Sequence, residues 1–545
     1  MYHQSRRWER AFGPLVAILG IVVLEVLVYL LPSLDTRMSV AALGGIVTVF
    51  FLLICLTRLE WGLAALLLLG ISFAKIPLYT QEFAGIYLSE LLVPFFLAVY
   101  LLRVLTRRQG PTEDSAIIRP LLLLSALAIS SLLYGNLMWD RTVPTNHRYF
   151  IVQVVGVVLI ILPVSTFILF ANGFDVRKHL RRLFQLSVAL PSLAAVVVVL
   201  AFAASSRDQL VAYALYGWRG IVDTTPVWAS PFTSWSTLGF LAIPLAFSAS
   251  VYTTRLRTRV VMWAFLAPPL VLTLASLKIG GLIATFSSLA VVAWFRSKRL
   301  FAALLIIAAI LAVGETVVTD GGTVAALIGN AEKKQSFDRL GIFKDGLTIW
   351  LTNPVLGVGP GNYYSYSYRY SSFLNVIAGN SRLAGEQSNP YGNAHNGYIQ
   401  ILSELGIVGF GLFLWFLVAA LRRAASAVRG AETLLEKAFA TGALGAVAGM
   451  LIDMFTMHGV YYSVSAEGYS TFVAGMYVWA ALGMLVALSR RQSAQNPGRA
   501  EGLDRSSQSE PKQYWANGAR CVAIPAPEAG LRRRSTHGNL SIYER

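Results

Sequence analysis

The chain has few charged residues and almost no cysteine. Only 13% of its 545 residues are charged, whereas 56% are hydrophobic. Its two cysteines, Cys55 and Cys521, lie far apart in the sequence, so they provide neither a disulfide framework nor a cysteine metal site. No internal repeat of fixed period is visible, which disfavours the inverted-repeat architecture of many secondary transporters.

Long apolar segments fill most of the first 489 residues. Each is about 17–25 residues long, the length that crosses a hydrocarbon core. Hydrophobicity indicates about fourteen spans. They cover residues 11–32, 39–57, 61–79, 84–105, 117–135, 149–171, 183–204, 234–253, 259–277, 279–295, 300–318, 397–421, 438–457 and 470–489. The sequence therefore predicts an all-α polytopic membrane bundle, with a long extracytoplasmic loop that contains short amphipathic helices.

Basic residues are concentrated in alternate connections between these spans. Cytoplasmic loops collect Lys and Arg, and the basic connections are those that contain Arg6, Arg7, Arg10, Arg103, Arg107, Arg108, Arg177, Lys178, Arg181, Arg182, Arg255, Arg257, Arg259, Arg296, Lys298, Arg299, Arg422 and Arg423. This parity makes both termini cytoplasmic and turns the loop 319–396 outward. The net charge of +17 then reflects topology and a basic tail, and we expect no nucleic-acid partner.

Two domains are expected. Residues 1–489 form the membrane domain, with an extracytoplasmic catalytic loop at 319–396. Residues 490–545 are rich in Arg, Ser, Gln, Gly and Pro and have no apolar periodicity, which is typical of a disordered tail.

The long loop has three recognisable parts. Apolar residues recur every three or four positions from Phe337 to Leu351, which predicts an amphipathic helix along the membrane surface. The run NPVLGVGPGNYY at 353–364 has the Pro and Gly residues of tight turns and close backbone approach. The loop ends at NAHNGYIQILSELG, residues 393–406, which places His395 where a membrane helix meets water.

Three segments resemble the bacterial O-antigen ligase and O-antigen polymerase superfamily of multi-spanning glycosyltransferases. HNGYIQILSELGIVG at 395–409 is similar to the family's His-Asn helix start followed by Glu-x-Gly. RLGIFKDGLTIWLTNPVLGVGPGNY at 339–363 resembles its Arg-led helix and Pro-x-x-Gly-x-Gly turn, and 218–245 resembles an Arg-Gly segment ahead of a span. One departure is SLKIGG, where Lys278 stands at the position of a family arginine and offers a charge without the bidentate fork.

The resemblance implies transfer of a glycan from an undecaprenyl-diphosphate carrier to an acceptor hydroxyl, on a glycan or on lipid A core, in the bacterial inner membrane. His395 is suited to act as general base, because the unperturbed pKa of histidine is near 6.5. Guanidinium groups bind phosphate oxygens in forks, so Arg219, Arg339, Lys278 and Arg148 are the diphosphate-binding candidates. We expect neither a cofactor nor a metal ion, and the partners are the lipid-linked donor, the acceptor and membrane lipids.

Two further residues are candidates for a supporting role. Asn396 is expected to cap the helix that follows it. Glu404 lies nine positions after His395, about two and a half turns of a regular helix, which places the two side chains on opposite faces. Glu404 therefore has either a packing or acceptor-side role or a catalytic one, without direct contact to His395.

Other functions remain open at this point. A repeat-unit polymerase of the same superfamily shares the His-Asn motif. A flippase or transporter of lipid-linked glycans also has many spans, although it would place ionisable residues near mid-membrane. A peptidoglycan-type glycosyltransferase would be expected to use an acidic catalytic residue in its outer loop.

Overall fold

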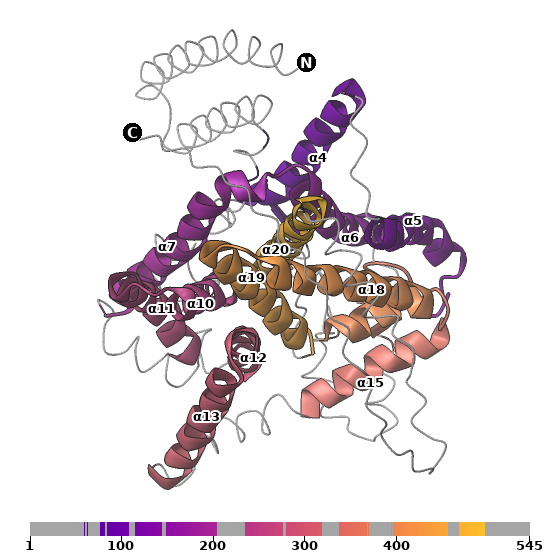
Figure 1. The fold of residues 1–545 in the computed structure, drawn as a ribbon. Coiled ribbons are helices and arrows are strands. Elements are labelled where there is room, and N and C mark those ends of the chain that lie inside the picture. The colour runs from indigo at the N-terminus through magenta and orange to yellow at the C-terminus, as the bar shows by residue number, and fades with distance from the viewer. Residues whose placement is uncertain are drawn as a thin grey trace, which may run out of the picture. The chain divides into compact units, whose positions relative to one another are not determined.

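Helices form nearly all of the described structure, a computed structural model (Figure 1). It describes residues 59, 63, 77–81, 84–107, 115–143, 149–203, 235–275, 279–318, 337–363, 365–367, 369, 394, 396–455 and 468–495. The helices are α4 (Leu88–Arg107), α5 (Ser115–Leu137), α6 (Tyr149–Asn172), α7 (Val176–Ala203), α10 (Trp235–Tyr252), α11 (Leu256–Ala275), α12 (Ile279–Arg296), α13 (Lys298–Val318), α15 (Phe337–Thr352), α18 (Gly397–Gly430), α19 (Leu434–Asp453) and α20 (Gly468–Gln495). The predicted spans 11–32 and 39–57 lie outside these residues, as do residues 496–545 of the predicted tail 490–545.

A short hairpin departs from the all-α prediction. Strands β1 (Pro77–Gln81) and β2 (Ala84–Tyr87) pair antiparallel. The predicted spans 61–79 and 84–105 extended into these strands, so the expectation of helix was wrong there. Tyr79, Thr80 and Ile86 are β-branched or aromatic residues that suit a strand, and Pro77 occupies the first strand position, where a missing N–H is tolerated.

Five described helices are long and apolar enough to cross a membrane. They are Ala116–Leu137, Val152–Asn172, Leu256–Leu274, Gly397–Gly430 and Leu434–Asp453, and each overlaps a predicted span. Prolines lie inside α4, α5, α6, α7, α10 and α11. Interior proline is tolerated in membrane helices because neighbouring groups satisfy the freed backbone.

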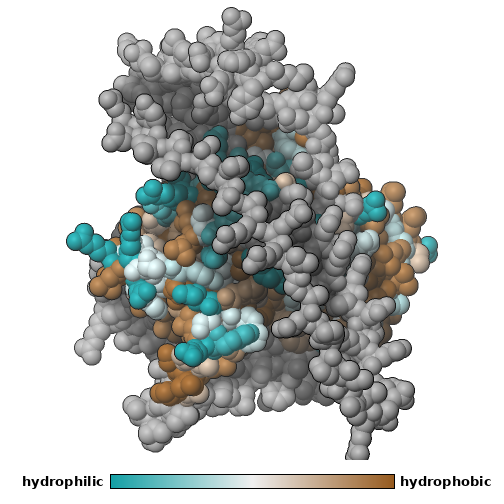
Figure 2. Space-filling model, in the orientation of Figure 1, coloured by the Kyte–Doolittle hydropathy of each residue, from teal (hydrophilic) through white to brown (hydrophobic). Residues whose placement is uncertain are grey.

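Large apolar side chains remain exposed on several of these helices. On α5, Leu133 is 73% exposed and Leu137 is 83% exposed, and on α13 Ile310 is 62% exposed. Figure 2 shows brown hydrophobic side chains over α5, at the right of the view. Such an apolar surface suits contact with lipid rather than with water.

The glycines Gly442, Gly445 and Gly449 of α19 allow close helix packing. A Cβ on Gly442 would lie 2.9 Å from Leu245 Cα on α10. A Cβ on Gly445 would lie 2.8 Å from the carbonyl oxygen of Ser288 on α12. Small residues let helix backbones approach where a hydrophobic driving force between helices is weak. These glycines therefore allow α19 to pack closely against both α10 and α12.

Ion pairs hold one end of the bundle together, here called the Arg177 end. Arg177 Nε lies 2.8 Å from Glu436 Oε1, which joins the start of α7 to the start of α19. Arg490 and Arg491, near the end of α20, contact Asn172 and Asp175 respectively. The structure thus brings together the starts of α7 and α19 and the end of α20. The alternation of basic connections assigned these segments to the same side of the membrane. Helix α20 continues to Gln495, past the predicted span end at 489.

Candidate active site

Asn396 caps α18 at the opposite end of the bundle, here called the Asn396 end. Its Oδ1 accepts hydrogen bonds from the N–H groups of Tyr398 (3.0 Å) and Ile399 (3.1 Å), so the predicted cap is confirmed. Its Nδ2 donates to the carbonyl of Phe455 at 3.1 Å. Gly397 N donates to the carbonyl of Met454 at 2.8 Å. The start of α18 is therefore joined to the C-terminal end of α19.

Helix α18 is broken at Gly406, whereas the sequence predicted one regular helix there. Gly406 has φ +65°, and the broken helix leaves carbonyl and N–H groups without helical partners. The turn 353–362 satisfies them. Val358 N and Gly359 N donate to the carbonyls of Ser403 and Glu404, each at 2.9 Å. Ile407 N donates to the carbonyl of Pro354 at 2.9 Å, and Val408 N to that of Val355 at 3.2 Å.

Glycines make this contact between loop and helix possible. Gly357, Gly359 and Gly361 have φ of 72°, 95° and 78°, a region that side chains rarely adopt. A Cβ on Gly357 would lie 2.5 Å from the carbonyl oxygen of Glu404. The predicted close backbone approach of the Pro-Gly turn is confirmed, and its partner is the break in α18.

Four buried polar side chains and the half-buried amide of Asn136 connect four segments beside this turn. They form what we call the outer polar cluster: Asn136, Gln153, Asn362, Gln400 and Glu404. Asn136 Nδ2 donates to Gln153 Oε1, and Gln153 Nε2 donates to Asn362 Oδ1, both at 2.9 Å. Gln400 Nε2 donates to Glu404 Oε1 at 2.7 Å, and Gly361 N donates to the same oxygen at 3.2 Å.

The cluster extends to the residue just before His395. The N–H of Ala394 donates to Gln400 Oε1 at 2.7 Å. Glu404 is 4% exposed and, through Gln400, fixes the backbone at Ala394 while also holding Gly361. Glu404 thus supports the backbone just before His395 through Gln400, and it also supports the turn at Gly361.

The predicted amphipathic helix is present as α15, which lies alongside α18 (Figure 1). Its buried face is different from the predicted apolar stripe. Ile342, Asp345, Gly346 and Ile349 are buried, whereas Leu347 is 41% exposed and Leu351 is 65% exposed. Leu347 of the predicted stripe therefore faces away from the protein, and the face that contains Asp345 packs against α18.

The pKa values of two carboxylates at this end are shifted in opposite directions, and the causes differ. Hydrogen bonds from Thr142 lower the pKa of Asp140, and the ion pair with Arg369 lowers it further. Burial raises the pKa of Asp345 from 3.8 to about 6, against a weak opposing effect of Lys344. Burial also raises the pKa of Tyr363, and the charges of Asp345 and Glu404 add to that effect. The Tyr363 hydroxyl donates to the carbonyl of Ile342 at 3.2 Å.

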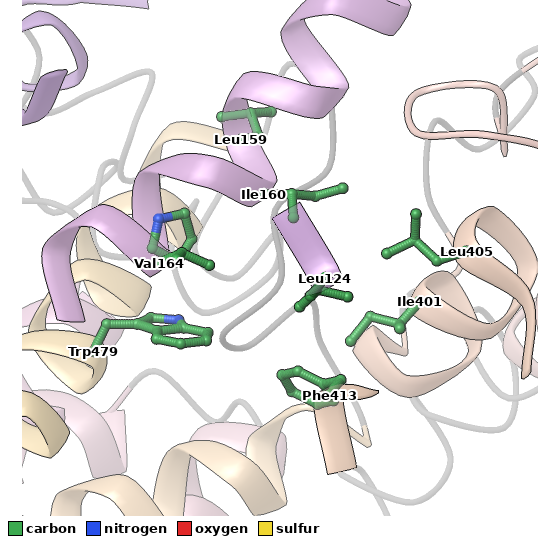
Figure 3. A pocket seen from close by; sticks show the side chains of 9 residues that line it. Leu124, Leu159, Ile160, Val164, Ile401, Leu405, Phe413 and Trp479 are labelled. Atoms are coloured by element: carbon green, nitrogen blue, oxygen red, sulfur yellow. The ribbon is translucent and has the colours of Figure 1, made fainter. Parts of the chain in front are cut away.

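A separate cavity lies among α5, α6, α18 and α20 (Figure 3). Every lining residue is apolar: Leu124, Leu159, Ile160, Pro163, Val164, Ile401, Leu405, Phe413 and Trp479. A sugar or a diphosphate would lose its hydrogen bonds to water there without replacement. This cavity therefore does not suit a sugar or a diphosphate.

Most of the predicted site residues lie at the edges of the described segments. His395 stands between the described residues Ala394 and Asn396, and Arg148 directly precedes α6. Lys278 directly precedes α12, and Arg339 is in the first turn of α15. His395, Arg148, Lys278 and Arg219 are themselves outside the described residues, as is the side chain of Arg339.

Sequence reasoning missed Asp345, Arg369 and the amides Asn136, Gln153 and Asn362. Asp345 follows Lys344 and lies outside the apolar stripe of its helix, so the neighbouring sequence gave no indication that it is buried. Asn136 and Asn362 are more than two hundred residues apart in sequence. Arg369 was visible as the single cation in the tyrosine-rich stretch 363–370.

Five helices of membrane-crossing length, with a buried polar cluster at one end, indicate a helical membrane protein. Residues 263–414 match the model of a protein family described as O-antigen ligase. A search of curated proteins finds no match. The family match runs from α11 to the middle of α18 and includes Lys278, Arg339, His395 and Glu404. It confirms the resemblance to the O-antigen ligase and polymerase superfamily and supports an enzyme role of that type.

Proposed function

We propose that this protein transfers a glycan from an undecaprenyl-diphosphate carrier to an acceptor hydroxyl at the extracytoplasmic face of the bacterial inner membrane. The observation that carries the proposal is the polar framework around the start of α18. Asn396 and Gln400 hold the backbone on either side of His395, inside the segment that matches the O-antigen ligase family.

The proposed reaction is one displacement at the anomeric carbon. The acceptor oxygen forms the new bond to that carbon, and the bond from the carbon to the diphosphate oxygen breaks. His395 takes the proton of the acceptor hydroxyl as general base. The leaving diphosphate carries negative charge, which Arg219, Arg339, Lys278 and Arg148 stabilise. A single attack inverts the anomeric configuration.

A ligase is the preferred form of this activity, and a repeat-unit polymerase of the same superfamily is the alternative. Both move a lipid-linked glycan onto a hydroxyl, so both use the same base and the same anionic leaving group. They differ in the acceptor. The intermediate that accumulates without the protein separates them, because loss of a ligase leaves long unattached chains whereas loss of a polymerase leaves single repeats.

The function is tested in a strain from which the gene is deleted. We expect wild-type protein to restore glycan transfer and His395→Ala to leave the lipid-linked intermediate in place, at equal protein levels in the membrane. His179→Ala is the control, because His179 is in α7 near the Arg177 end, where it packs on Phe174. Restoration of transfer by His395→Ala would remove histidine as the base.

A further inference from the structure

Asp345 is a buried carboxylate that the fold does not explain. It is 8% exposed, in the middle of α15. Within the part of the chain that the structure describes, no donor forms a hydrogen bond with it, and the one cation whose charge acts on it is its exposed neighbour Lys344. A buried carboxylate without a donor is costly. The described residues leave this carboxylate without a hydrogen-bond donor.

The face of α15 that includes Asp345 packs on the start of α18. Ile342 and Ile349 lie three and four residues from Asp345, so they share its side of the helix, and Gly346 is the buried residue next to it. A Cβ on Gly346 would overlap Ile399 in the first turn of α18. Ile349 also belongs to one buried cluster with Tyr363 and Ala394. Asp345 is thus on the face that meets the residues on both sides of His395.

Among the described residues, the titratable groups other than Lys344 that interact with Asp345 add no counter-charge. Tyr363, from the segment packed against α15, has a neutral phenol group. Its hydroxyl already donates a hydrogen bond to the carbonyl of Ile342. Glu404, from α18, is negative when ionised and acts on the same phenol as Asp345 does. A neutral molecule rich in hydroxyl donors suits such a surrounding better than an anion does. Sugars have this chemistry.

We propose that Asp345 binds the acceptor sugar by accepting a hydrogen bond from one of its hydroxyl groups. The inference rests on the proposed glycan transfer and deepens it. An ionised carboxylate only accepts hydrogen bonds, and a bond from a hydroxyl to a charged oxygen is stronger than a neutral one. No bond forms or breaks at Asp345, and the reaction proton goes to His395. Asp345 orients the acceptor next to the base.

The test is a comparison of substrate dependence in full-length Asp345→Asn and wild-type protein. Lipid-linked glycan and the acceptor fraction, both extracted from the deletion strain, are titrated separately. We expect the KM for the acceptor fraction to rise at least tenfold while the KM for the lipid-linked donor stays unchanged. Leu351→Ala, a change at a residue of the same helix that is 65% exposed, is the control and should leave both values unchanged.

Three results would overturn the inference. Unchanged acceptor dependence in Asp345→Asn is one, and an equal loss of acceptor and donor use is another, because it would make the role structural. The third comes from Asp345→Leu, which fills the site without a charge: wild-type transfer by this variant would show that only packing matters. If His395→Ala is inactive in the same assay, such results contradict only the role of Asp345 and leave the proposed glycan transfer in place. If His395→Ala is active, the proposed function itself fails.

Discussion

At the scale of single residues, different side chains hold the two sides of His395. Asn396 accepts hydrogen bonds from the first turn of α18, and Gln400 accepts one from the N–H of Ala394. Glu404 holds Gln400 in turn. A backbone that is fixed before the substrate arrives need not be ordered during the reaction, which is the advantage of preorganised sites.

Asp345→Asn should stabilise the protein above about pH 6. Burial raises the pKa of Asp345 from 3.8 to about 6. The neutral acid is therefore favoured in the folded state, and the folded protein loses stability as the pH rises from about 4 to about 6. Thermal unfolding in detergent should show a larger advantage of Asp345→Asn at pH 7.5 than at pH 4.5. An equal advantage at both values would contradict the burial effect.

The sequence was informative at this scale where a residue acts on its immediate neighbours. The cap formed by Asn396 and the turn glycines follow from local backbone chemistry, and both are confirmed. Asp345 was not predicted, because its environment is made by Tyr363 and α18 rather than by α15. The amides Asn136, Gln153 and Asn362 meet only when three separate segments pack together.

At the scale of elements, the turn 353–362 and the break in α18 act as one unit. The turn supplies two donors and two acceptors to backbone groups that the break at Gly406 leaves without helical partners. In a membrane protein such a break is tolerated only where protein satisfies the freed groups. The turn is therefore required for the broken helix to exist.

Gly357→Ala should disrupt this unit. The added Cβ would lie 2.5 Å from the carbonyl oxygen of Glu404, on a residue with φ +72°. The strained backbone and the overlap together should cost on the order of 3 to 5 kcal/mol. The melting temperature in detergent, followed by tryptophan fluorescence, should fall clearly. Gly411→Ala, also in α18, is the control, since a Cβ there would have no described neighbouring atom within 4 Å. This variant should be neutral or slightly stabilising. Equal melting temperatures for the two variants would contradict the account.

The length of the apolar segments in the sequence predicted the described helices well, because crossing a hydrocarbon core imposes a length and an apolar composition. It did not predict the break at Gly406 or the hairpin at 77–87, which depend on partners elsewhere. The apolar stripe of α15 located its outward side, and the protein-facing side had to come from the structure. Periodicity identifies an apolar face without saying whether lipid or protein covers it.

At the scale of the whole molecule, two polar ends flank an apolar body. The Arg177 end is formed by ion pairs among α7, α19 and α20, and the Asn396 end contains the outer polar cluster. Charge alternation in the sequence places the Arg177 end in the cytoplasm. The structure groups the relevant segments at one end, and the assignment of that end to a compartment remains a prediction.

Cysteine labelling tests this sidedness. After Cys55 and Cys521 are replaced, single cysteines are introduced by Arg141→Cys near the Asn396 end or by Glu432→Cys near the Arg177 end, both at exposed positions. A membrane-impermeant maleimide added to intact spheroplasts should label the first variant and should label the second only after permeabilisation. The opposite pattern would invert the topology and place the proposed site in the cytoplasm.

Glycan transfer by purified protein in proteoliposomes tests the role of His395 most directly. The donor and acceptor fractions come from the deletion strain, and initial rates are compared for the wild type and His395→Ala. Loss of a general base typically lowers a rate by about 10²- to 10⁴-fold. We predict a loss in that range for a variant that keeps the wild-type melting temperature. A folded His395→Ala protein that transfers glycan at a rate within a few-fold of the wild type would contradict the account.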